Sequence, residues 1–267
     1  MLRYLRIYAI LLRNSLIREM SFKANFLLWS LVEILWFAGQ IFFIEVLFSR
    51  VERIGDWSKW EVLALIGTHQ VIGQIFQALF YMNLTQIPEL VRTGKLDTLL
   101  TLPIDAQFTV STKQFGLDNL LNTLSGVCFV TYALHRLHIT PSPGSLAVYA
   151  LCILLGVSVH YSVMFGLSTL CFWIKRSQGL VHAYFSLFNL GRYPDSVFQG
   201  AFRFVFSWLV PVIVVSNVPV RFLTQPLREP LSLLPLFCQL CAASAGIFVL
   251  VRLLWKRALA RYSSASS

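Results

Sequence analysis

The stretch Gln86–Asp105, QIPELVRTGKLDTLLTLPID, governs how the rest of the chain is interpreted, because it is a polar island between two long apolar runs. Pro88 and Gly94 bracket a short amphipathic helix, since proline is favoured in a first helical turn and glycine just past the last one. Glu89 lies near the positive end of that helix and Lys95 follows its negative end, as the helix dipole prefers. A structureless loop needs no such order. We interpret the island as a segment on the cytoplasmic side that another protein binds.

The composition excludes a soluble globular domain of this size. Of the 267 residues, 57% are hydrophobic and 13% are charged, and the mean hydropathy is +0.68. Soluble domains are typically about 45–50% apolar and about 25% charged. We therefore expect an all-α integral membrane protein with six apolar segments of about 20 residues each. A single transmembrane domain is expected over residues 1–262, followed by a disordered tail over 263–267.

Apolar runs between polar loops predict where the chain crosses the bilayer. The expected spans are 24–48, 62–84, 115–134, 146–174, 178–193 and 232–254. The region of the fifth span has two readings. In one, 178–193 is a short span and 197–219 folds back as a re-entrant hairpin with its bend at Pro211. In the other, 201–218 is the full fifth span. Both readings give six crossings.

The basic residues predict the orientation. With the N-terminus inside, 14 of the 22 Lys and Arg residues lie in cytoplasmic segments and 8 lie in outer segments. This bias places both termini and the 86–105 island in the cytoplasm. Residues 1–22 can form an amphipathic helix on the membrane interface, with Arg3, Arg6 and Arg13 on one side. The alternative is a basic overhang that only fixes topology. Because the basic residues are spread between apolar runs, the net charge of +10 does not indicate nucleic-acid binding.

Polar residues inside the expected spans are candidates for a translocation path. Glu33 lies in the first span, and Gln70, Gln74 and Gln77 share one face of the second span at i, i+4 and i+7. A carboxylate in the middle of a bilayer costs on the order of 2.5–3.5 kcal/mol, so Glu33 should face protein or water. A polar stripe on a membrane helix should face other helices or a water-filled path. For both features the alternative is a helix–helix contact without a transport role.

The sequence carries no motif for catalysis. Its only Gly-Lys pair, Gly94-Lys95, is not part of a GxxxxGK[ST] phosphate-binding loop, and HExxH and GxSxG are absent. All five cysteines fall in apolar segments, and the spacing of Cys238 and Cys241 alone is weak evidence for a metal. We therefore expect no catalytic residue, no metal site and no cofactor on this chain.

Three runs resemble one bacterial family. They are GDWSKWEVLALIG (Gly55–Gly67), IPELVRTGKLDTLLTLPI (Ile87–Ile104), and RYP (Arg192–Pro194) followed by an apolar segment that ends at Pro211. The most specific part is the pattern Arg-x-Gly-x-Leu-Asp then Leu-x-x-Pro within the second run. The chain is similar, over nearly its whole length, to the permease subunits of type-2 ATP-binding cassette (ABC) exporters. One departure is the run Asn189-Leu190-Gly191 before RYP, where the family favours a more alanine-like lead-in.

The resemblance implies a non-enzymatic transporter subunit of the bacterial cytoplasmic (inner) membrane. Two permease subunits would pair, and two separate ATPase subunits, which bind ATP and Mg²⁺, would dock below them. A short coupling helix within 86–105 would fit a groove on the ATPase. The residues that would make or support this contact are Glu89, Leu90, Arg92, Lys95 and Asp97. The re-entrant hairpin would help form an outer gate, for which the candidates are Arg192, Tyr193, Pro194 and Pro211.

An ion-coupled secondary transporter is the alternative function. Its polar intramembrane site would consist of Glu33, Gln70, Gln74 and Gln77. Such transporters are built from inverted repeats and broken helices, and the two halves of this sequence show no repeat.

Overall fold

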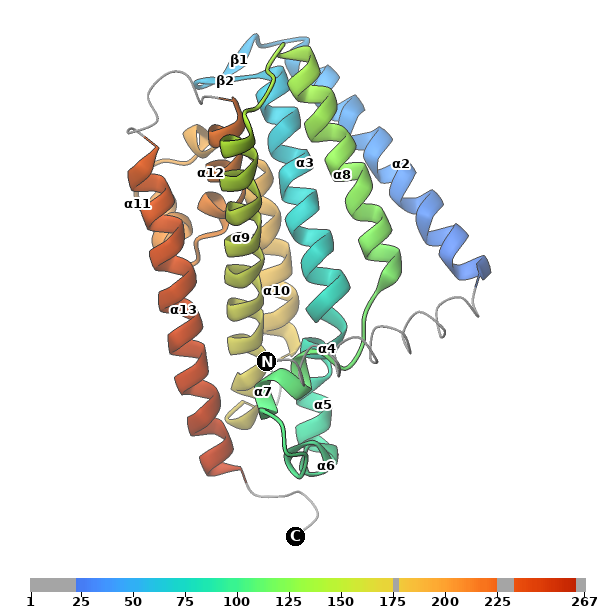
Figure 1. The fold of residues 1–267 in the computed structure, drawn as a ribbon, viewed down its shortest axis with the longest axis vertical. Coiled ribbons are helices and arrows are strands. Elements are labelled where there is room, and N and C mark those ends of the chain that lie inside the picture. The colour runs from blue at the N-terminus through green and yellow to red at the C-terminus, as the bar shows by residue number, and fades with distance from the viewer. Residues whose placement is uncertain (1–22, 175–177, 225–232, 263–267) are drawn as a thin grey trace.

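The computed structural model describes residues 23–174, 178–224 and 233–262. The predicted interfacial helix within 1–22 and the predicted tail at 263–267 lie outside these residues. In the described part, long helices form a bundle with a two-stranded hairpin at one end and the short helices of residues 82–111 at the other (Figure 1). The order of elements is α2 (Lys23–Phe48), β1 (Arg53–Ile54), β2 (Trp57–Ser58), α3 (Lys59–Phe76), η1 (Gln77–Tyr81), α4 (Met82–Thr85), α5 (Ile87–Arg92), α6 (Lys95–Leu100), α7 (Ala106–Ser111), α8 (Leu117–Arg136), α9 (Pro143–Thr169), η2 (Leu170–Phe172), α10 (Gln178–Phe188), η3 (Asn189–Arg192), η4 (Asp195–Val197), α11 (Gly200–Phe204), η5 (Val205–Leu209), α12 (Val212–Thr224) and α13 (Leu234–Arg261).

Local sequence signals start the two central helices. Ser58 and Glu61 form a capping box at α3, in which the Ser58 amide donates to the Glu61 carboxylate at 2.8 Å and the Glu61 amide donates to the Ser58 hydroxyl at 3.4 Å. At α9 the Ser142 hydroxyl accepts from the Ser145 amide at 3.1 Å, and Pro143 occupies the first turn. These caps satisfy backbone donors that otherwise have no partner at a helix start.

Helix α3 is the centre of the bundle and packs against α8, α9 and α12. Gly67 of α3 and Gly126 of α8 allow the closest approach, because a Cβ atom built on either would lie 2.8 Å from the carbonyl oxygen of the other. Small residues let membrane helices pack backbone to backbone in this way. The largest core cluster lies between α3, α9 and α12 and includes Ile72, Phe76 and Val215.

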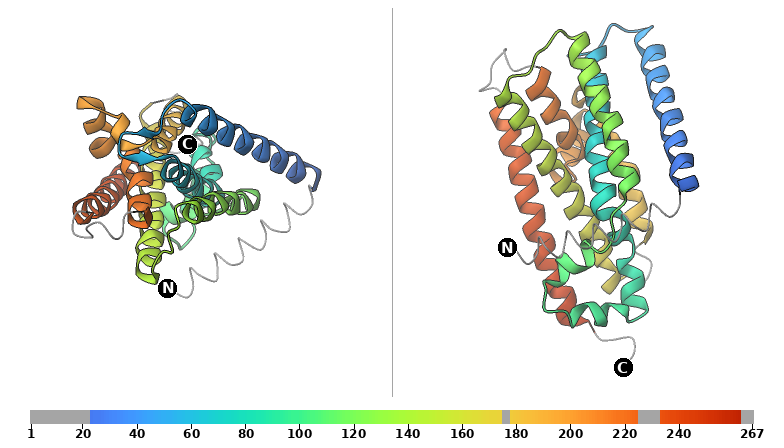
Figure 2. Two further views of the ribbon diagram at one scale, coloured as in Figure 1. Left: turned by 90° about the horizontal axis from the view of Figure 1, so that it is seen from above. Right: turned by 45° about the vertical axis from the view of Figure 1, so that its right-hand side comes forward.

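Helix α2 lies apart from the bundle along much of its length (Figure 2). Its apolar side chains are largely exposed, among them Leu35, Phe42 and Val46. Exposed apolar residues of this density are unfavourable in water and ordinary in hydrocarbon. We infer that much of α2 faces lipid or another membrane-embedded surface.

Three helical stretches among the described residues are long and apolar enough to cross a membrane, namely Lys59–Arg92, Pro143–Phe172 and Leu234–Arg261. A fourth is added if the bent pair Gly200–Leu209 and Val212–Thr224 counts as one span. The six predicted crossings are therefore not confirmed. The apolar part of α2, Ile34–Phe48, is shorter, and α10 has only 11 residues. The first turns of α8 carry Asp118, Asn119 and Asn122.

The 86–105 island contains more helix than the sequence predicted. Helix α5 lies where Pro88 and Gly94 were expected to bracket a helix, and Gly94 adopts a positive φ of 71° just beyond its end. This left-handed backbone conformation is strained for any residue that has a Cβ atom, so glycine is favoured at this position. Helix α6 follows Gly94 directly, and α7 begins after Asp105, whose carboxylate accepts from the Phe108 amide at 3.0 Å. The sequence analysis predicted neither α6 nor α7.

No straight helix covers residues 201–218. Helix α11 continues into η5, which ends at Leu209. Helix α12 begins at Val212, after a bend of 82°. Pro211 lies in this break, as expected of a residue without an amide hydrogen to donate. The chain before the bend, α10 and η3, covers Gln178–Arg192.

Candidate functional site

A charged network joins three separate segments at the β1–β2 end of the molecule. Arg221 of α12 donates to the Asp195 carboxylate at 2.7 Å and to the Asp56 carboxylate at 3.0 Å. The indole nitrogen of Trp57 also donates to Asp195, at 3.1 Å. Only 14% of the Arg221 side chain and 15% of the Asp195 side chain are exposed. We call Asp56, Trp57, Asp195, Asn217 and Arg221 the hairpin-end network.

Asn217 extends this network to the RYP segment. Its side-chain amide donates to the carbonyl oxygens of Tyr193, at 3.2 Å, and Ile213, at 2.9 Å. Its side-chain oxygen accepts from the Asp195 amide at 2.9 Å. Tyr193 and Pro194, two of the predicted gate residues, are thus held by a buried side chain of α12, and predicted gate residue Pro211 precedes that helix.

Sequence reasoning missed the members of this network. Asp195 directly follows RYP, and Arg221 is one of the 8 basic residues that the sequence assigned to outer segments. Their ion pair joins residues 26 positions apart, and the pair of Arg221 with Asp56 spans 165 positions. The available signal was an Asp adjoining a recognised motif together with an Arg inside an apolar helix.

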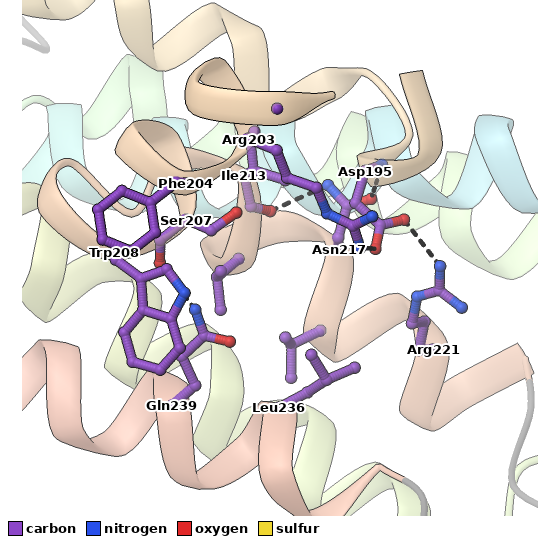
Figure 3. A pocket seen from close by; sticks show the side chains of 13 residues that line it. Asp195, Arg203, Phe204, Ser207, Trp208, Ile213, Asn217, Arg221, Leu236 and Gln239 are labelled. Atoms are coloured by element: carbon purple, nitrogen blue, oxygen red, sulfur yellow. Dashed lines mark hydrogen bonds and ion pairs between the residues drawn. The ribbon is translucent and has the colours of Figure 1, made fainter. Parts of the chain in front are cut away.

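A cavity of about 330 Å³ lies beside the network, between the break after η5 and helix α13 (Figure 3). Arg203 enters it from α11 and reaches Asp195 at 3.7 Å, although 56% of its side chain is exposed. The Gln239 amide donates across the cavity to the Ser207 carbonyl at 2.9 Å. The polar groups around this cavity therefore bond to one another and hold the bent helix pair against α13.

The predicted glutamine stripe is split by the fold. Gln70 and Gln77 line a small cavity of about 60 Å³, together with Gln40 of α2 and with Asn189 and Arg192 of η3. Gln74 is buried and does not line it. Glu33 lies in α2, and its side chain is outside the described part of the structure. The fold thus brings a predicted gate residue, Arg192, to the same cavity as two predicted path residues.

The five predicted coupling residues take different positions. Arg92 and Glu89 form a bidentate pair, with nitrogen–oxygen distances of 2.9 and 2.7 Å, on the surface of α5. Lys95 is exposed as well, and Asp97 is half-buried. Leu90 is instead buried. The other fully buried anchors of the segment, Ile87 and Leu96, were not predicted.

A second polar network links the 86–105 segment to the long helices. Arg252 of α13 pairs with both carboxylate oxygens of Asp105 and donates to the Gln107 side chain at 2.8 Å. Gln107 in turn donates to the Tyr161 hydroxyl of α9 at 3.0 Å. The pKa of the Asp105 carboxyl is below its usual value, mainly because of the hydrogen bonds from Arg252. These bonds connect the 86–105 segment to α9 and α13.

Within residues 23–174, 178–224 and 233–262, no group of three or more His, Cys, Asp or Glu side chains is placed to hold a metal ion.

Comparison with known proteins identifies one family. A family model described as ABC-2 family transporter protein matches residues 34–266. No curated protein and no solved structure matches the chain significantly. The matched range contains both polar networks, the glutamine cavity and the whole 86–105 segment.

Proposed function

The chain belongs to the ABC-2 family of transporter proteins, and on that premise we propose that it is an exporter permease driven by separate ATPase subunits that bind its 86–105 segment. The permease of an ABC transporter is its membrane component and is not catalytic. ATP and Mg²⁺ belong to the ATPase partner.

The observation that carries this proposal is the two-sided character of the 86–105 segment. Its apolar side chains Ile87, Leu90 and Leu96 are buried against the bundle. Its charged side chains Glu89, Arg92 and Lys95 are exposed on the opposite side. A segment that is anchored inward and charged outward is suited to transmit the movement of a partner to the helices above it.

The remaining assignments extend this proposal. Two copies, or this chain and a related one, form the translocation path in the bacterial inner membrane, with six crossings per chain and both termini in the cytoplasm. The bent pair α11–η5 and α12 is a re-entrant hairpin, and Arg192, Tyr193, Pro194 and Pro211 belong to an outer gate beside it. Closure of the ATPases pushes α5 and α6, and Asp105, Gln107 and Arg252 pass the displacement to α9 and α13. A switch of this kind needs two packed arrangements that the partner biases. The family match does not support an ion-coupled secondary transporter.

The test is co-purification of the ATPase. The double variant Arg92→Glu, Lys95→Glu reverses both outward charges, and we expect it to lose the partner while inserting normally into the membrane. The matched control is Lys256→Glu, Arg257→Glu, which makes the same charge change at two exposed residues of α13 outside the segment. Equal recovery of the ATPase with both double variants would refute the docking role.

The orientation is tested by labelling with a membrane-impermeant thiol reagent, in a background without the five native cysteines. We expect Thr93→Cys to be labelled only in opened cells and Glu52→Cys to be labelled in intact cells, since both positions are exposed. Labelling of Thr93→Cys in intact cells would reverse the proposed topology.

A further inference from the structure

A large apolar cleft separates helix α2 from the β1–β2 end of the bundle. It has a volume of about 810 Å³ and is lined by Leu35, Gly39 and Phe43 of α2, by Ile54 of β1 and by Val197 of η4. Ligand pockets commonly measure about 300–1,000 Å³. Several lining side chains are also exposed at the surface, among them Leu35, Phe43 and Val197. The cleft is therefore accessible from the side, where a bilayer would lie.

The cleft continues into the small cavity that contains the glutamines. Four residues line both, namely Trp36, Gln40, Ile66 and Arg192. The larger part offers apolar surface, and the smaller part offers the side-chain amides of Gln40, Gln70, Gln77 and Asn189. Together they form one amphipathic site, with an apolar body and a polar end.

Arg192 is the charge at the junction of the two parts. Its Nε atom is buried and has no hydrogen-bond partner. Among the described residues, no carboxylate lies within ion-pair distance of its guanidinium group. Its guanidinium carbon lies 5.5 Å from the centroid of the Tyr193 ring. A charged group with a buried, unbonded nitrogen is costly, so this guanidinium is suited to an anion supplied from outside the chain.

Arg221, beside the neighbouring cavity, shows how the same fold pairs an arginine with carboxylates of its own chain. Arg221 has two carboxylate partners from its own chain, Asp195, as Figure 3 shows, and Asp56. Asp195 lies only three positions from Arg192, yet it pairs with Arg221 and Arg203. Among the described residues, the carboxylate of Asp195 is therefore paired with other arginines, and Arg192 lines the cleft.

We propose that this cleft binds an anionic amphiphile, with an acyl chain along α2 and an acidic headgroup on Arg192. A guanidinium group suits the headgroup because it donates two parallel hydrogen bonds to a carboxylate or phosphate. We further infer that the transported cargo belongs to the same chemical class as the bound amphiphile, and this step rests on the proposed transport function.

The experiment uses photoactivatable lipid probes on the purified full chain in lipid nanodiscs. A phosphatidic acid with a diazirine in its acyl chain is compared with the matching phosphatidylcholine, and the crosslinked residues are located by mass spectrometry. We expect the wild type to be labelled on α2 and at 193–197, more strongly by phosphatidic acid. Arg192→Gln should reduce phosphatidic acid labelling about tenfold, the loss expected of one charge-assisted bond. It should reduce phosphatidylcholine labelling less, because the choline cation neutralises the charge of that phosphate. Arg203→Gln, at the other cavity, is the control and should change neither.

A second variant keeps the proposal testable if Arg192→Gln fails to fold. A Cβ atom at Gly39, which lines the cleft, meets nothing within 4 Å, so a side chain can start there and we expect Gly39→Trp to fill the cleft. It should abolish labelling at these positions by both probes. Gly246→Trp, at an equally open position of α13, should not. Unchanged labelling of Gly39→Trp, or equal labelling of Arg192→Gln and wild type by phosphatidic acid, would overturn the proposal. A third result would also overturn it. If the wild type shows no labelling at the cleft, and Gly39→Trp is monomeric where the wild type is not, a second copy of the chain occupies the cleft.

The same preparations separate this inference from the proposed function. The ATPase should co-purify with Gly39→Trp as it does with wild type, although lipid labelling is lost. If phosphatidic acid labels the wild type at the cleft and no ATPase associates with it, the transport proposal fails and the binding site stands.

Discussion

The two polar ends of the molecule hold their charges in opposite ways. At the hairpin end, Arg221 and Asp195 are 14% and 15% exposed, and each has further partners within the chain. At the opposite end, the side chains of Arg92 and Glu89 are 73% and 50% exposed and pair only locally, three residues apart. The hairpin-end network connects segments that are far apart in the sequence, whereas the charged side chains of α5 lie on the surface. This difference fits internal cohesion at the first end and, on the proposed function, an external partner at the second.

The largest expected effect comes from breaking the hairpin-end network. Arg221→Met leaves Asp195 nearly buried with its principal partner removed, and removing one member of a buried ion pair typically costs about 3–5 kcal/mol. We expect a large fall in the thermal midpoint of the protein in detergent. Arg203→Met is the control, because Arg203 is exposed and 3.7 Å from Asp195, and it should cost no more than about 1 kcal/mol. Equal shifts for the two variants would show that the network contributes no cohesion.

The second effect tests the connection between the 86–105 segment and the long helices. Asp105→Asn keeps an N-cap for α7 but removes the charge that pairs with Arg252. Loss of a hydrogen bond to a charged group typically costs about 1–3 kcal/mol. Arg252→Gln should lower the thermal midpoint by a similar amount, and the double variant should lower it little further because both remove the same interaction. Strictly additive losses would contradict a shared interaction.

The sequence predicted the local features of both ends and missed their long-range contacts. Pro88 and Gly94 located α5 because helix starts and stops depend on neighbouring residues. The pairs of Arg221 with Asp56 and of Arg252 with Asp105 join residues 165 and 147 positions apart. Such pairs form only when the chain folds and distant segments come together, so the periodicity of the sequence does not predict them. The glutamine stripe shows the same limit, since a shared helix face did not reveal that Gln74 is buried away from the cavity of Gln70 and Gln77.

A smaller effect is the pH dependence of the Asp105 contribution. The Arg252 guanidinium holds the pKa of Asp105 below its usual value in the folded state. A carboxyl with a lowered folded pKa stabilises the protein above its unfolded pKa of about 3.9 and loses that contribution as the pH falls through the folded pKa. The difference in thermal midpoint between wild type and Asp105→Asn should be constant between about pH 5 and 8 and shrink below about pH 4. A difference that persists unchanged in acid would exclude this carboxylate as its source.

The smallest effect on stability is expected at the surface of α5, and it sharpens the comparison most. The double variant Glu89→Arg, Arg92→Glu keeps an ion pair three residues apart but exchanges the positions of the two charges. Because both side chains are exposed and exposed pairs contribute little, the thermal midpoint should not change measurably. Co-purification of the ATPase should nevertheless fall, since a partner recognises where each charge lies and not merely that the two are paired. A lower thermal midpoint with normal ATPase recovery would invert the assignment, because this surface would then serve cohesion, as the hairpin end does.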